Sequence, residues 1–210
     1  MYLNPLNIIQ RSSACGGLDM GSGVDCDDPI VAGVDQRLVL INKDIYDRAT
    51  VVENVSIPNL IDSIVLTQTG DSGFAFQGIR KSLNPQSAYV PAAVSQGFDH
   101  QVDFLIFDIG QAQKNNIEKM TGGKFVAIIQ NSSAAGNKDA IFEVFGKDVG
   151  LTMQASPMRI NGDLETNGAY TIALKTSDDF GKEPHLPSSY NVTDFAGTLV
   201  QITTILTPVV

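Results

Sequence analysis

The apolar and polar residues in the C-terminal half of the chain follow the pattern of consecutive β-strands. Short apolar runs bounded by Gly, Asn and Asp are typical of strands, whereas helices need longer segments with a period of 3.6 residues. Runs of this kind lie between Phe125 and Pro187, at residues 125–131, 140–146, 150–156 and 169–176. Their order predicts one continuous β-meander.

Strand patterns also occur in the N-terminal half. Residues 37–42 and 100–107 are short apolar runs, and residues 73–80 alternate as in a half-buried strand. Residues 61–68 are rich in β-branched side chains, and the turn sequence TGDSG follows them. We therefore expect 61–68 and 73–80 to form a β-hairpin.

Two further segments complete the expected β-structure. Residues 81–96 contain Pro85 and Pro91, which predicts either an exposed loop or an edge segment. The sequence LVQITTIL at residues 199–206 is rich in β-branched side chains and predicts a last strand.

One segment has the pattern of an α-helix. Residues 109–120 place Ile109, Ala112, Ile117 and Met120 on one stripe, with Asp108 as the expected N-cap and Gly122 as the expected stop. Residues 44–60 fit neither period, and their structure stays open. The fold class predicted from these patterns is mainly β, a β-sandwich or barrel with one flanking α-helix.

The first 35 residues differ in character from the rest. They are rich in Gly and Asp and show no period, so we expect residues 1–35 to form an extended N-terminal arm that contacts a neighbour. Residues 36–210 then form a single domain. The spacing of Cys15 and Cys26 allows a disulfide, although two thiols in a chain without an export signal favour the reduced state. The arm's acids, Asp19, Asp25, Asp27 and Asp28, do not fit the EF-hand spacing.

Composition narrows the function classes. Apolar residues make up 43% of the chain and charged residues 18%, which favours a folded domain with some surface covered by neighbours. The net charge of −9 argues against a nucleic-acid-binding module, which needs cations to neutralise phosphates. No uncharged apolar run approaches the ~20 residues of a membrane span. The first residues lack a basic n-region, so we expect the protein to stay where it is made.

Candidate chemistry is sparse. The two histidines are His100, expected to be a satisfied surface residue, and His185, which lies between two prolines in KEPHLP and suits a rigid contact. Asp163 and Glu165 resemble a carboxylate pair but lie in an expected turn, where solvated acids are usual. The Gly-rich segments match neither a P-loop nor a dinucleotide fingerprint. We therefore expect no catalytic, cofactor-binding or metal-binding residues.

A family resemblance rests on three motifs in chain order. The first is D-x-R-L-x-L-I-N from Asp35 to Asn42; the second is strand–helix–Gly-Gly–strand from Phe104 to Ile129; the third is F-x-V-x-G-x-x-x-G-L from Phe142 to Leu151, followed by GAYTIALKT and KEPHLP. In these motifs the chain resembles virion structural proteins of tailed phages of Bacteroidetes hosts, including crAss-like phages. It is similar in layout to the phage tail-tube protein family. The resemblance spans residues 35–187.

The resemblance implies a β-sandwich or barrel beside one helix, with an arm that reaches adjacent subunits. It implies a virion structural protein without catalytic activity or cofactor, which self-assembles into hexameric rings or a tube that lines the DNA channel of a tail. The implied partners are copies of the chain, other tail or neck proteins and passing genomic DNA that is not specifically bound, with no membrane. The implied location is the virion tail, after assembly in the host cytoplasm. Asp71, Asp139, Asp163 and Glu165 are the acids expected to face the lumen.

Two alternatives remain. One is a neck, ring, tail-terminator or capsid auxiliary protein of related layout. The other is a carbohydrate-binding β-sandwich module, which would expose aromatic side chains on a binding face; the chain has no Trp and only 7% aromatic residues, which disfavours this alternative.

Overall fold

The computed structural model describes residues 33–79, 82–91, 96–132, 141–154, 156–163, 165–177 and 181–210. Most of the predicted arm, with Cys15, Cys26 and the four clustered acids, lies outside the described residues. The first strand begins at Val34, so Val34 and Asp35 belong to the sheet.

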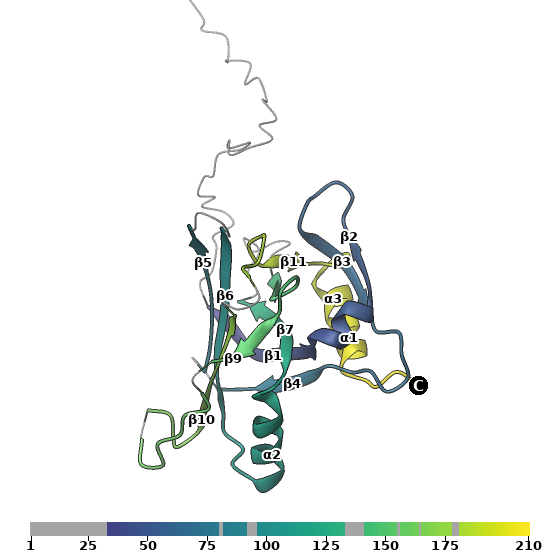
Figure 1. Cartoon of the computed structure of the whole chain (residues 1–210). Helices are drawn as coiled ribbons and strands as arrows, with labels where there is room; N and C mark the ends of the chain where they lie inside the picture. The colour runs from purple at the N-terminus through teal and green to yellow at the C-terminus, as the bar shows by residue number, and fades with distance from the viewer. Residues whose placement is uncertain are drawn as a thin grey trace, which may run out of the picture.

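Two antiparallel strands form the centre of the molecule, β1 (Val34–Asn42) and β7 (Lys124–Asn131) (Figure 1). The interior of β7 is buried on both faces, and Leu38 to Ile41 of β1 are buried as well. A strand covered on both faces has an almost continuous apolar sequence, since neither face meets water. FVAII in β7 and LVLI in β1 fit this rule.

The sheet forks beside β7. β8 (Phe142–Phe145) and β9 (Leu151–Met153) both pair with β7, through Ala127↔Phe145 and Phe125↔Leu151. Between them, residues 146–150 leave the ladder as a loop. Each of the two short strands then continues the sheet in its own direction.

The two branches hold the remaining strands. From β8 the order is β11 (Ser188–Tyr190), β3 (Leu60–Val65) and β2 (Thr50–Glu53). From β9 it is β10 (Tyr170–Thr176), β6 (Gly97–Ile106) and β5 (Leu83–Val90). β4 (Phe74–Gln77) pairs with the outer side of β1. The pairing of β11 with β3 is parallel and the other strand pairs are antiparallel, so the sheet is mixed.

A hydrophobic core lies on each face of the central strands. One contains Leu38, Leu40, Phe125 and Ile129 with the β6 and β10 side chains and α2 (Gln111–Met120). The other contains Val39, Ile41, Val126 and Ile128 with β3, α1 (Lys43–Arg48) and α3 (Phe195–Ile205). Alternate residues of β1 and β7 thus enter opposite cores, as the period of two requires.

The mainly β prediction is confirmed, but two predicted connections are wrong. The meander is interrupted because β8 and β9 pair with β7 and not with each other. The hairpin around TGDSG does not form: β3 pairs with β2 and β11, while β4 pairs with β1. Both errors concern which strands pair. For residues 81–96 the edge alternative is confirmed, since β5 ends the sheet path.

The prediction of one helix is also wrong, because the described residues contain three. α2 begins at Gln111, two residues after the expected start, since the Asp108 carboxylate accepts a hydrogen bond from the Gly110 N–H and forms a turn there. Ile109 is consequently exposed, and Ile117 and Met120 carry the buried stripe. α1 occupies part of the segment that was left open.

The predicted last strand is part of the helix α3. Asp194 caps its N-terminus by accepting from the Gly197 N–H at 2.7 Å. Thr198, Ile202 and Ile205 form the buried stripe of helical spacing. The hydroxyl groups of Thr203, Thr204 and Thr207 donate to carbonyls four residues earlier. These bonds give the threonine hydroxyl groups acceptors inside the helix, although threonine by itself prefers strands. The packing of α3 against the second core favours the helix over a strand.

Candidate functional site

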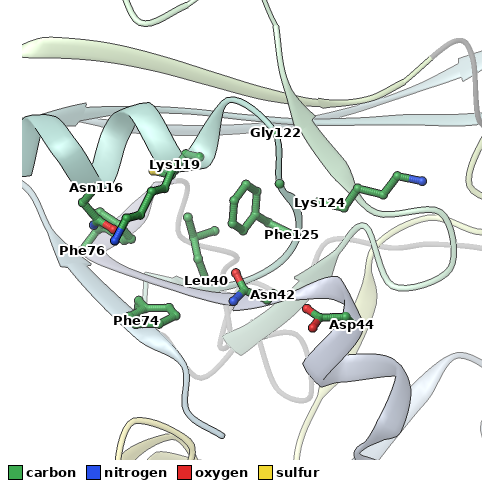
Figure 2. A pocket seen from close by; sticks show the side chains of 12 residues that line it. Leu40, Asn42, Asp44, Phe74, Phe76, Asn116, Lys119, Gly122, Lys124 and Phe125 are labelled. Carbon is green, nitrogen blue, oxygen red and sulfur yellow. The ribbon is translucent and has the colours of Figure 1, made fainter.

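A groove lies between the C-terminal end of α2 and the β4–β1–β7 sheet (Figure 2). Its volume is about 620 Å³. The floor is apolar, formed by Leu40, Phe74, Phe76 and Phe125, because the register places Phe74 beside Leu40 and Phe76 beside Leu38. Phe74 remains 47% exposed, so this part of the first core is only partly covered.

The groove has a polar rim. Its rim residues are Asn42, Asp44, Asn116, Lys119 and Lys124. The loop after α2 closes one end of the groove, and a Cβ at Gly123 would lie 2.5 Å from the Phe125 ring, so only glycine fits there. The rim carries two cations, Lys119 and Lys124, and one anion, Asp44, so the groove suits an apolar group with polar ends. Among the described lining residues there is no His, Ser, Thr or Cys, so the groove offers a binding surface without a hydroxyl, thiol or imidazole nucleophile.

A second polar cluster surrounds Glu183, which is 1% exposed. Its carboxylate accepts the N–H groups of the loop that forks the sheet, from Asp148 at 3.0 Å, Val149 at 2.8 Å and Gly150 at 3.2 Å. Burial raises the pKa of Glu183, and the three N–H bonds oppose that rise because they favour the charged form. Gly150 has a φ of 89°, a conformation that favours glycine.

Backbone bonds fix Glu183 on the sheet. Its N–H and C=O exchange hydrogen bonds of 3.0 and 2.8 Å with Phe98 of β6. The side chain of Glu183 therefore links the β10–β6 branch of the sheet to the loop between β8 and β9. This connection is structural, because both carboxylate oxygens are already engaged with backbone donors.

His100 holds the start of the same loop. Its Nδ1 accepts the Gly146 N–H at 3.1 Å, so the neutral ring carries its proton on Nε2, which donates to the His185 carbonyl at 3.0 Å. The ring packs edge-on against Phe145. Burial lowers the pKa of His100 to about 4. With both nitrogens bonded, the ring has no lone pair left for a general base.

The prediction for His100 was thus half right: the ring is satisfied, but it is buried and not at the surface. The His185 side chain is exposed, and its backbone carbonyl makes the contact to His100. One feature of the sequence pointed to this contact. His185 lies between two prolines, which restrict the geometry of the backbone that bonds His100.

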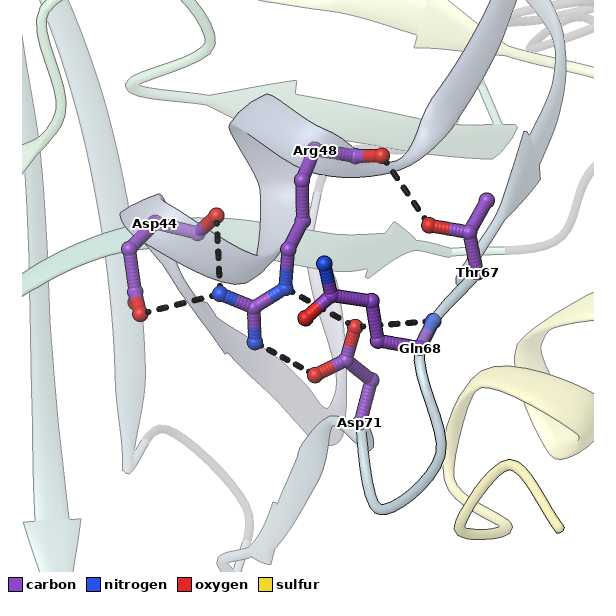
Figure 3. Close-up of polar contacts among 5 residues, drawn as sticks. All are labelled: Asp44, Arg48, Thr67, Gln68 and Asp71. Atoms are coloured by element: carbon purple, nitrogen blue, oxygen red, sulfur yellow. Dashed lines mark hydrogen bonds and ion pairs between the residues drawn. The ribbon is translucent and has the colours of Figure 1, made fainter.

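A third cluster centres on Arg48 and Asp71 (Figure 3). The guanidinium forms a two-pronged contact with Asp71, through Nε to Oδ2 at 3.0 Å and through Nη2 to Oδ1. Asp71 also accepts the Gln68 N–H, and Thr67 donates to the Arg48 carbonyl. The hydrogen bond from Arg48 lowers the pKa of Asp71. The contacts join α1 to the loop between β3 and β4.

The prediction that Asp71 faces a lumen is wrong, since its side chain is buried and paired. Asp163 caps a turn by accepting from the Thr166 hydroxyl and the Glu165 N–H, and Glu165 is exposed, as expected for a turn between strands. Asp139 lies outside the described residues. Lumen orientation of Asp163 and Glu165 stays a prediction.

We expect Arg48→Ala to lower the Tm by about 3–8 °C, because it leaves a buried carboxylate without its cation. Thermal unfolding followed by circular dichroism measures the change. Asp44→Asn is the matched control, since it removes only the exposed contact of Arg48 with Asp44 on α1. Equal Tm changes in the two variants would contradict a stabilising role of the Asp71 pair.

β5 is an edge strand whose surface is largely exposed. Its residues from Asn84 to Ala88 are exposed apart from half-buried Pro85, and Tyr89 is 55% exposed. β6 is its hydrogen-bonded neighbour, and the opposite side of β5 ends the described sheet. The sequence from Ser82 to Phe98 contains no charged residue. Edge strands are usually protected by charges, so this edge has the character of a covered surface.

Comparison with family models, with curated proteins and with solved structures found no match to this chain. Within the described residues, no cluster of three or more His, Cys, Asp or Glu side chains is arranged to hold a metal ion. The helices of the described part are too short or too polar to span a bilayer.

Proposed function

We propose that this chain is a structural protein that assembles with copies of itself through the β5 edge. The observation that supports the proposal is the uncharged, exposed edge of β5, eight residues long. Its free backbone groups can pair with another strand, and the charges that normally prevent such pairing are missing. Its one edge-protecting device, Pro85, lies near the start of the strand and leaves the following residues available.

The other end of the sheet supports a head-to-tail arrangement. β2 ends the sheet path opposite β5, and the two strands lie on opposite sides of the molecule (Figure 1). Contacts between two different surfaces of identical subunits close into rings when the rotation between neighbours allows it. We therefore propose rings in which the β5 side of one copy meets the β2 side of the next.

On the resemblance to the tail-tube family, we propose that the assembly is a ring or tube around the DNA channel of a phage tail, and that each copy has a sandwich or barrel fold. The net charge of −9 supports this assignment, because an acidic wall lets DNA slide without counterion-release affinity. Binding through the α2 groove would then serve neighbouring virion proteins, and DNA would pass without specific contacts.

Electron microscopy and mass photometry of the full chain test the assembly. We expect rings or tubes about 80–120 Å across, the size of roughly six such domains in a circle. A chain that stays monomeric at high concentration would refute the proposal.

A variant pair tests the edge itself. Gln86→Lys with Ala88→Lys places two charges on exposed edge positions and is expected to reduce the assembled fraction at least tenfold. The control, Gln111→Lys with Ala112→Lys, adds the same charge at exposed positions of α2 and is expected to assemble normally. Normal assembly of the β5 variant would exclude this edge as the contact.

A further inference from the structure

An apolar groove lies at the C-terminal end of α3. One wall is formed by Ile64 and Val65 at the end of β3 and by the next residue, Leu66, and the other includes Ile205 and Val209. Its volume is about 390 Å³. Two backbone bonds hold the wall in place, from the Gly70 N–H to the Val209 carbonyl at 2.8 Å and from the Val209 N–H to the Asp71 carbonyl at 3.0 Å. The groove is therefore a built feature of the fold.

The residues that line the groove carry no charged side chain. The sequence from Phe195 to Val210 lacks Asp, Glu, Lys, Arg and His, and the described groove residues share this property. Val65 is 48% exposed, and Val200 on α3 is 66% exposed. An apolar surface of this extent beside an apolar hollow is typical of a docking site for another apolar segment.

We propose that residues 1–10 of a second copy of this chain occupy the groove. The sequence MYLNPLNIIQ has no charged residue and places Tyr2, Leu3, Leu6, Ile8 and Ile9 within one short segment. Pro5 disfavours a helix there and suits an extended segment, which can lay alternate side chains into a groove. The first charged residue, Arg11, follows the segment directly.

The length of chain before the described sheet permits the exchange. There are 22 residues between Gln10 and Gly33. An extended chain spans about 3.3 Å per residue, so the reach is roughly 75 Å. A compact domain of this size is roughly 40 Å across. The groove lies beside Gly73, whose N–H bonds the Ile205 carbonyl, whereas Gly33 lies at the opposite end of β1 beside Ser132. A reach of nearly twice the domain is long enough for the groove of a neighbouring copy as well as for the chain's own groove. The choice of a neighbouring copy rests on the proposed function.

Photocrosslinking tests the occupant. A photoreactive amino acid replaces Thr204, an exposed residue of the groove, in the full chain, and mass spectrometry identifies the crosslinked peptide in rings mixed from normal and ¹⁵N-labelled copies. We expect crosslinks to residues 1–10 that join a labelled to an unlabelled chain. Crosslinks to another segment, or only within single chains, would overturn the proposal.

A variant pair supplies the control. Val65→Glu places a carboxylate in the groove and is expected to reduce these crosslinks at least tenfold, whereas Ile109→Glu, at a comparably exposed apolar residue before α2 and away from both the groove and the proposed ring contact, is expected to leave them unchanged. Equal effects of both variants would overturn the groove assignment. Wild-type rings without crosslinks to residues 1–10 would refute this inference and leave the assembly intact, whereas a monomeric wild-type chain would refute both.

Discussion

Glu183→Ala is expected to lower the free energy of unfolding by about 3–5 kcal/mol, the largest effect of a single polar substitution that we anticipate. The carboxylate is 1% exposed and accepts the N–H groups of Asp148, Val149 and Gly150. Its removal leaves three backbone N–H groups without their acceptor, that of Gly150 in a buried position, and a void where the side chain lay. The loop that forks the sheet then loses its attachment to the neighbouring branch.

Urea denaturation measures this change as a lower midpoint with an unchanged slope. Glu183→Gln is expected to be intermediate, because one amide oxygen replaces two carboxylate oxygens and the NH₂ group faces the Asp148 N–H. Glu165→Ala is the control, since this carboxylate is exposed, and its effect is expected to stay within about 0.5 kcal/mol. A loss below about 1 kcal/mol in Glu183→Ala would show that the loop does not depend on the carboxylate.

The elements that sequence predicts best here are those in which local pattern and burial agree. β7 is an apolar run buried on both faces, and β6 ends in another, so their strands were predictable within a few residues. β5 was predictable only as one of two alternatives, an exposed loop or an edge segment, because residues 81–96 contain Pro85 and Pro91. In these segments the pattern of side chains and the requirements of the fold point the same way.

The errors arise where tertiary contacts override local preference. Residues 199–206 are rich in β-branched side chains, yet Asp194 caps a helix and Ile202 and Ile205 pack into the second core. The Tyr190 hydroxyl and the Ile64 N–H both bond the Gln201 side chain, a contact across the chain that no local pattern shows. The capping residue was a usable signal: Asp194 precedes an apolar stripe of helical spacing.

Strand pairing could not be predicted, for a related reason. The loop at residues 146–150 separates β8 from β9, so that both strands pair with β7. The loop is held by hydrogen bonds to Glu183 and His100. Both residues are 33 or more residues away in sequence from the glycines that they bind. Gly146 and Gly150 were visible as motif residues, and both have positive φ. The acceptors that hold the loop were not visible, because a Glu or His in a sequence is as compatible with solvent as with a buried turn.

The second large effect that we expect is a loss of stability at acidic pH, caused by protonation of His100. His100 has a pKa of about 4 in the folded protein because burial disfavours its charged form, against about 6.5 when unfolded. A group whose folded pKa is depressed binds more protons when unfolded at intermediate pH, so it favours unfolding as the pH falls. The contribution of the neutral His100 ring to the free energy of unfolding is fully present above pH 6.5. It is lost progressively between pH 6.5 and 4, by on the order of 3 kcal/mol.

Comparison with His100→Gln isolates this contribution. Glutamine can accept the Gly146 N–H and donate to the His185 carbonyl, as the ring does, but it does not titrate. Burial raises the pKa of Glu183 and Glu143, which opposes the loss at low pH, and both residues are the same in the two proteins. The free energy of unfolding is measured for both proteins from about pH 8 down to about pH 4. We expect the value for the wild type to fall by about 3 kcal/mol relative to the value for His100→Gln over this range. Parallel curves would mean that the pKa of His100 is the same in the folded and unfolded protein, and that the buried, hydrogen-bonded ring contributes no pH-dependent stability.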